Sequence, residues 1–134
     1  MTLVDTNVLL DLVTNDPRWA EWSQAELERA ALAGPVFVND VVYAEMAPGF
    51  DRIEDLDRVL EDTLIDVLRT PRTALFLAGK AFRCYRASGG PRTGVLSDFF
   101  IGAHAAVEGW SLLTRDDRRY RVYFPTVRLI VPAA

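Results

Sequence analysis

The sequence has few of the residues that build cross-links or soft-metal centres: one cysteine, Cys84, and one histidine, His104, among 134 residues. A single cysteine excludes an intramolecular disulfide and any metal site made of several cysteines, which is typical of proteins in a reducing cytosol. The sequence also lacks any apolar run approaching the roughly 18–20 residues needed to cross a bilayer. No secretory signal is visible at the N-terminus. These absences predict a cytoplasmic protein that neither spans nor binds a membrane.

Length and composition are those of an ordinary globular chain. Half of the residues are hydrophobic and a quarter are charged, which excludes a disordered protein. Domains usually comprise about 100–200 residues, so residues 1–134 are expected to form a single domain. A chain of this length buries roughly two thirds of its unfolded surface and can build its own core.

Charge is distributed unevenly along the chain. The net charge of −4 argues against nucleic acid as a partner, because phosphate binding needs clustered cations. Residues 1–70 hold 15 of the 19 acidic residues, whereas residues 71–134 hold 10 of the 15 basic ones. The C-terminal half therefore permits an anionic partner, although runs of charge also mark ordinary solvated faces.

The apolar pattern predicts short strands that alternate with helices. Strands are expected at residues 3–4, 35–38, 64–68, 111–114 and 127–131. Helices are expected directly after Asp5, and at residues 16–33, 41–46, 53–60, 71–87 and 97–108. Five buried strands separated by helices predict a three-layer α/β/α domain around a central, mainly parallel sheet.

Four acidic residues follow or flank these predicted strands. In parallel sheets ligands bind beyond the carboxyl ends of the strands, so polar residues there are candidates for function. The four are Asp5, Glu45, Asp98 and Asp116. Each alone has a simple structural explanation; Asp5 or Asp98, for example, could merely cap a helix.

Together the four acids predict a metal site. A parallel sheet would bring them to one edge, where close carboxylates raise one another's pKa unless a cation neutralises them. Mg²⁺ and Mn²⁺ prefer oxygen ligands, whereas structural zinc sites favour cysteine and histidine. Such an ion would polarise a phosphoryl oxygen and make hydroxide accessible near neutral pH.

The same residues carry a family resemblance over nearly the whole chain. In order, the motifs are Asp5-Thr6-Asn7, Glu45, Ser97-Asp98-Phe99 and Thr114-Arg115-Asp116. This order resembles the PIN-domain ribonucleases, most closely their VapC toxin branch. The resemblance implies a PIN-like fold and a Mg²⁺- or Mn²⁺-dependent endoribonuclease. It also implies a homodimer, held inactive by a cognate VapB-like antitoxin.

The resemblance assigns a role to each matching acid. Asp5, Glu45, Asp98 and Asp116 are expected to be catalytic. Three of them, Asp5, Asp98 and Asp116, would hold the metal, and Glu45 would orient the attacking water or assist proton transfer.

Further residues are expected to support this site. Asn7 would help to hold Asp5, and Thr114 would orient a carboxylate or a water. Asp117 is an extra acid that could replace Asp116 as the last ligand. Three arginines beside the site, Arg115, Arg118 and Arg119, could contact substrate phosphate or could instead pair with local acids.

Two alternatives stay open at this level. A haloacid-dehalogenase-like phosphatase also begins with an aspartate after its first strand, but it requires a second aspartate where this chain has Asn7. It also requires a lysine between its acidic motifs, and the only lysine is Lys80. The other alternative is a non-catalytic module that binds RNA or protein on the same scaffold. His104, six residues after Asp98, is expected in the core or an interface.

Overall fold

The computed structural model describes residues 1–91 and 96–133. Its centre is a sheet of five strands, all pairing in parallel, in the order β3-β2-β1-β4-β5. The strands are β1 (Thr2–Val4), β2 (Val36–Asn39), β3 (Asp66–Leu68), β4 (Ser111–Leu113) and β5 (Leu129–Ile130). The predicted α/β class with a parallel five-stranded sheet is confirmed.

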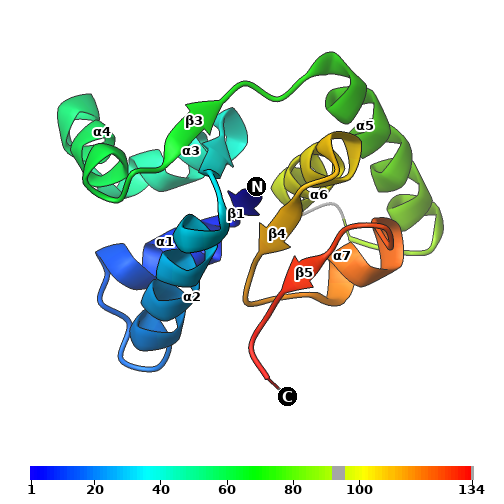
Figure 1. Ribbon diagram of the computed structural model, residues 1–134. Coiled ribbons are helices and arrows are strands. Elements are labelled where there is room, and N and C mark those ends of the chain that lie inside the picture. The colour runs from blue at the N-terminus through cyan, green and yellow to red at the C-terminus, as the bar shows by residue number, and fades with distance from the viewer. Residues whose placement is uncertain (92–95, 134) are drawn as a thin grey trace.

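Helices lie on both sides of this sheet (Figure 1). They are α1 (Thr6–Val13), α2 (Ala20–Ala33), α3 (Asp40–Met46), α4 (Ile53–Asp62), α5 (Arg72–Ala87), α6 (Leu96–Glu108) and α7 (Arg118–Tyr123), with a short 3₁₀ turn, η1 (Ala47–Gly49). The helices α1 and α2 pack together, as do α5 and α6, and α7 contacts α6. No helix in the described ranges is long and apolar enough to span a bilayer.

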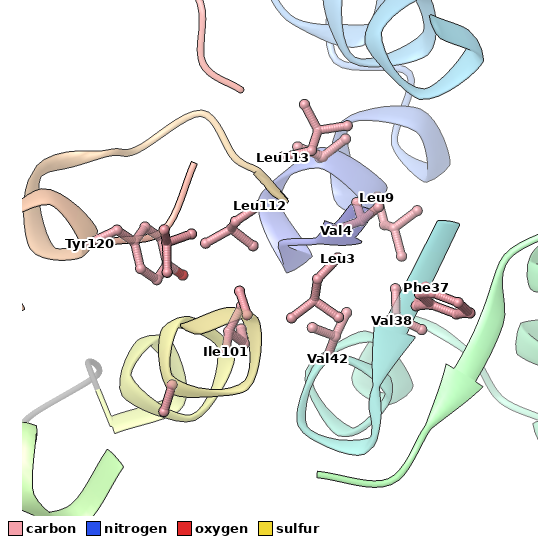
Figure 2. Close-up of a cluster of buried hydrophobic side chains, with 14 of the residues drawn as sticks. Leu3, Val4, Leu9, Phe37, Val38, Val42, Ile101, Leu112, Leu113 and Tyr120 are labelled. Atoms are coloured by element: carbon pink, nitrogen blue, oxygen red, sulfur yellow. The ribbon is translucent and has the colours of Figure 1, made fainter. Parts of the chain in front are cut away.

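The core is built around the central strand β1. Leu3 pairs in register with Phe37 of β2 and with Leu112 of β4, and all three side chains are buried. Because side chains alternate across a strand, Leu3 and Val4 point to opposite faces. Figure 2 shows Leu3 directed toward the α3 and α6 side and Val4 on the α1 side. Two apolar faces explain why the central strands β1 and β2 are buried along their whole length.

Several predicted boundaries shift by a few residues. Helix α2 begins at Ala20, not at position 16, because the Asp16 carboxylate accepts the backbone N–H groups of Arg18 and Trp19 and closes a separate turn. Strand β3 begins at Asp66, because Leu64 has a left-handed backbone with φ of 58° and is 83% exposed. The last strand, β5, comprises only two residues of the predicted 127–131.

Helix α7 has no counterpart in the sequence-based prediction. Its six residues are too few to be stable alone, so packing must supply its stability. Tyr120 and Phe124 pack against α6 at Gly102, where an added Cβ would overlap the Phe124 ring. The pair formed by Arg121 and Asp117, one turn apart, adds to this stability.

Candidate active site

The carboxyl ends of β1, β2 and β4 lie side by side, since β1 pairs with both neighbours in parallel. Asp5 follows β1 directly, and its backbone N–H donates to the carbonyl of Leu113 in β4. Glu45 lies on α3, directly after β2, and Asp116 follows β4. Asp98, in the first turn of α6, completes the set.

Hydrogen bonds through three hydroxyl residues link the four acids. Thr6 contacts both Asp5 and Glu45, Ser97 beside Asp98 contacts Glu45, and Thr114 contacts both Asp5 and the backbone of Asp116. The negative charge of Asp98 acts on Asp5, and the charges of Glu45 and Asp116 act on Asp98. All four sequence-predicted acids are therefore brought together, as expected from the carboxyl ends of parallel strands.

Asp5 forms the buried floor of the site, with 4% of its surface exposed. One oxygen, Oδ1, accepts the backbone N–H of Thr6 at 2.7 Å, so Asp5 also caps α1. The other, Oδ2, accepts hydroxyl protons from Thr114 at 2.7 Å and from Tyr120 at 2.8 Å. Asn7 adds a longer contact of 3.5 Å from its Nδ2.

Burial raises the pKa of Asp5 from 3.8 to about 6. The charge of Asp98 adds to this effect, whereas the hydrogen bonds from Thr114, Tyr120 and Thr6 oppose it. Since burial penalises the charged form, each donor partly replaces the lost hydration of the carboxylate. A nearby positive charge would therefore strongly favour the ionised form of Asp5.

Thr114 links the floor to the loop that carries Asp116. Its hydroxyl is fully buried and, besides donating to Asp5, accepts from Asn7 Nδ2 at 3.3 Å and from the backbone N–H of Asp116 at 3.2 Å. Asn7 in turn accepts the backbone N–H of Arg115 at 3.2 Å. The supporting positions predicted for Asn7 and Thr114 agree with these contacts.

Glu45 is exposed at the rim and is held by two hydroxyls. Thr6 Oγ1 donates to Oε1 at 2.6 Å, and Ser97 Oγ donates to Oε2 at 3.0 Å. Both donors belong to motifs adjacent to the other acids. The two bonds connect α3 to α1 and α6, and they orient the carboxylate with both oxygens as acceptors.

Asp98 and Asp116 are each paired with an arginine from the first turn of α7. Arg119 Nε lies 3.1 Å from Asp98 Oδ2, and Arg118 Nε lies 3.3 Å from Asp116 Oδ1. Burial raises the pKa of Asp98, even though Arg119 partly offsets it. Burial acts in the same sense on Asp116, but there the hydrogen bonds and charge of Arg118 outweigh it and lower the pKa.

Two residues predicted near the site face other partners. Asp117 precedes α7 and its carboxylate binds Arg121. Arg115 is engaged by Asp11 of α1, with Nε 2.6 Å from Oδ2 and a second bond of 2.9 Å to Oδ1. Of the two possibilities for Arg115, phosphate contact or an ion pair with a local acid, the structure shows the ion pair.

Four residues at or beside the site were not identified from the sequence. Tyr120 was missed because α7 was not predicted, and Asp11 because its partner is distant in the chain. Thr6 and Ser97 stand within the quoted motifs, and their hydroxyl groups directly beside Asp5 and Asp98 were the available signal that they hold a carboxylate. The prediction that His104 is a core residue is confirmed; it is buried with Nδ1 3.2 Å from the Asn39 amide.

The donor chemistry fits a hard divalent cation. Every candidate ligand is a carboxylate, the type of donor that Mg²⁺ and Mn²⁺ prefer, and the mutual repulsion of the acids favours a cation. As arranged, no group of three histidine, cysteine, aspartate or glutamate side chains within residues 1–91 and 96–133 could hold a metal ion. Asp98 and Asp116 are paired with Arg119 and Arg118 in this arrangement.

Comparisons with known proteins identify relatives of this fold. The fold is similar to chains in crystal structures of VapBC2 from Rickettsia felis bound to a promoter DNA fragment (TM-score 0.75, 18% identity, 98% of both chains covered) and of FitAcB from Neisseria gonorrhoeae (TM-score 0.71, 20% identity, 97% and 96% covered). A third is DNA-bound VapBC from Salmonella typhimurium (TM-score 0.70, 20% identity, 97% and 96% covered). The sequence has no match among curated proteins. A model of the PIN domain matches residues 2–125, and the chain therefore belongs to the PIN domain family.

Proposed function

We propose that this protein is a Mg²⁺- or Mn²⁺-dependent endoribonuclease, and that it acts as the toxin of a toxin–antitoxin pair. The observation that carries the proposal is the convergence of four acids around the buried carboxylate of Asp5. Membership of the PIN domain family supports nuclease chemistry and argues against the phosphatase alternative.

The proposed metal ligands are Asp5, Asp98 and Asp116. Asp5 would be the anchoring ligand, because it is buried and its orientation is set by four donor groups. Asp98 and Asp116 would contribute their carboxylates once these are released from Arg119 and Arg118. When bound, Mg²⁺ or Mn²⁺ supplies polarisation of the phosphoryl oxygen and a lowered pKa of coordinated water.

Glu45 is proposed to orient the attacking water and to accept its proton. The hydroxyls of Thr6 and Ser97 hold one carboxylate oxygen each, which restricts rotation of the side chain. Each oxygen retains a lone pair for a water, since a carboxylate offers about four acceptor positions. Positioned groups of this kind typically contribute 10²–10⁴-fold to a rate.

Arg118 and Arg119 are proposed to bind the substrate phosphate. In the structure they neutralise Asp116 and Asp98, and an RNA phosphate is the anion that would replace those carboxylates when the acids bind a metal. Arg115 is not part of this proposal, because Asp11 occupies its guanidinium.

The proposed partners are RNA, a VapB-like antitoxin and a second copy of the chain. The antitoxin is supported by the complexes that the structural neighbours form, VapBC and FitAcB among them. Cellular RNA as the substrate places the activity in the cytoplasm.

The decisive experiment compares RNA cleavage by the purified protein with Mg²⁺, with Mn²⁺, and with a chelator. We expect cleavage with either ion, none with the chelator, and at least about a hundredfold loss in Asp5→Asn, because even residues that only support a metal ligand typically contribute 10–100-fold. Asp66→Asn is the matched control. Asp66 is exposed at the amino end of β3, away from the carboxyl ends of the strands where the site lies, so this variant should be fully active.

Other outcomes would select other functions. Cleavage that persists with chelator, or that is undiminished in Asp5→Asn, would overturn the metal-nuclease proposal. Hydrolysis of small phosphomonoesters with RNA left intact would indicate a phosphatase. Binding of RNA without turnover under every condition would indicate a non-catalytic module.

A further inference from the structure

Asp11 is a buried acid with two partner residues, one on α2 and one in the segment after β4. It is on α1 and is 2% exposed. Its carboxylate accepts the hydroxyl of Ser23 in α2 at 2.8 Å and two guanidinium N–H groups of Arg115, which follows β4. None of these three residues is a candidate metal ligand, so the proposed chemistry does not use them directly.

Arg115 is held through both its backbone and its side chain. Asn7 accepts its backbone N–H, and Asp11 binds its guanidinium through two bonds. Asn7 and Asp11 are four residues apart and therefore share one face of α1. The guanidinium carbon also lies 5.2 Å from the ring centroid of Trp19, a distance at which cation–π attraction acts. Helix α1 therefore contacts Arg115 at two points.

This arrangement bears directly on Asp116, the next residue in the chain. The loop of residues 114–116 carries two of the groups that build the site, the Thr114 hydroxyl and the Asp116 carboxylate. Asp116 itself is half exposed, with a side chain 50% accessible, and its side-chain partner Arg118 is 86% accessible. Its backbone N–H donates to the buried Thr114 hydroxyl, so the residues before it also help to set its position.

We propose that Asp11 is a positioning residue for Asp116: by binding Arg115 it fixes the loop of residues 114–116 against α1 and so keeps Asp116 beside the other acids of the site. The inference rests on the proposed nuclease function. A two-point ion pair with a planar guanidinium restricts orientation more than a single contact, and a lysine cannot reproduce it. Residues that orient metal ligands typically affect metal affinity by 10–100-fold.

The experiment uses the full chain and three variants. Asp11→Asn removes the charge, and Arg115→Lys retains a charge at position 115 but loses the paired bonds. Arg29→Gln is the matched control, because it breaks an exposed ion pair with Glu26 on α2. For each protein we would measure the melting temperature, the Mn²⁺ dissociation constant by calorimetry, hydrogen exchange of the backbone amides of residues 115 and 116, and RNA cleavage.

We expect Asp11→Asn to raise the Mn²⁺ dissociation constant about 10–100-fold and to accelerate exchange of the two amides, both measured well below its melting temperature. Arg115→Lys should change both quantities in the same direction by a smaller factor, and it decides the question if Asp11→Asn does not fold. Arg29→Gln should match the unmutated protein.

Two negative results can be distinguished. A lower melting temperature with unchanged Mn²⁺ affinity and unchanged amide exchange would mean that the pair only stabilises the fold, and would overturn the positioning role alone. If the unmutated protein neither binds Mn²⁺ nor cleaves RNA, the proposed function is overturned and the positioning role with it.

Discussion

Asp5 and Asp116 lie in the same acidic site, but their surroundings differ sharply. Asp5 is almost fully buried and accepts hydrogen bonds from Thr114, Tyr120 and the backbone of Thr6. Asp116 is exposed, and its carboxylate is bound by the exposed side chain and the backbone N–H of Arg118. Burial raises the pKa of Asp5 to about 6, whereas the pKa of Asp116 is lowered because Arg118 outweighs the effect of burial.

The difference shows that keeping Asp5 ionised costs the fold free energy, whereas keeping Asp116 ionised does not. One pKa unit corresponds to about 1.4 kcal/mol, so ionised Asp5 destabilises the fold by about 3 kcal/mol. The folded state binds the Asp5 proton more tightly than the unfolded state does. Protonated Asp5 therefore stabilises the fold relative to ionised Asp5. This stabilisation is complete at low pH and is lost as pH rises between about 4 and about 6. A bound cation would offset the cost.

Of the substitutions around Asp5 and Asp116, removal of the Thr114 hydroxyl beside buried Asp5 should have the largest effect. Thr114→Val keeps the shape of the side chain but leaves Asp5, the Asn7 amide and the Asp116 N–H without their shared partner. We expect unfolding to become easier by about 1–3 kcal/mol. Cleavage should fall about 10–100-fold, as is typical when the support of a metal ligand is removed.

Chemical denaturation and single-turnover cleavage measure these two effects. Thr126→Val is the matched control, because Thr126 is exposed and lies after α7. A Thr114→Val protein with unchanged activity would show that the floor does not depend on this hydroxyl.

Removing the Tyr120 hydroxyl should change pH dependence more than maximal rate. The Tyr120 O–H donates to Asp5 Oδ2, and burial together with the charge of Asp5 raises the pKa of this phenol, so it stays a donor. Hydrogen bonds to charged groups contribute about 1.5–3 kcal/mol, so Tyr120→Phe should raise the pKa of Asp5 by about one unit or more.

The acid limb of the cleavage profile should therefore move to higher pH in Tyr120→Phe, with a smaller change at the alkaline plateau. The pH dependence of single-turnover rates, together with an NMR titration of the Asp5 carboxyl group in metal-free protein, tests this shift. Tyr123→Phe on the same helix is the control, since Tyr123 packs against Tyr85 and Phe99. An acid limb that stays in place would contradict the role of Tyr120.

Removing the exposed partner of Asp116, Arg118, should have the smallest effect, on RNA affinity and on its salt dependence. Arg118→Gln removes one cation that is proposed to contact phosphate, so RNA should bind more weakly and the slope of affinity against salt should flatten by about one. Binding is measured in the Asp5→Asn background, so that substrate is not consumed. Arg58→Gln on α4 is the control, because that arginine is exposed within the acidic half of the chain. An unchanged slope in Arg118→Gln would exclude this phosphate contact.

The four acids and the residues that hold them differ in how far the sequence could predict them. The four acids were identified because each follows or flanks a strand of a pattern that indicates a parallel sheet. Tyr120 was not, because it lies on a six-residue helix too short to be stable alone, whose stability depends on packing against Gly102. The role of Arg115 stayed open for a similar reason, since its partner Asp11 is 104 residues away.

The sequence alone determined the alternation of strands and helices, apart from α7, and the parallel sheet, and it pointed to the four acids as site candidates. These features depend on local patterns: the period of apolar residues, the caps and breaks of helices, and the position of polar residues after strands. Tertiary structure decided which arginine meets which acid, which hydroxyls hold Asp5 and Glu45, and which carboxylate is buried. Those outcomes depend on distances between segments far apart in the chain, and the charge and hydrogen-bonding capacity of a residue do not reveal its partner.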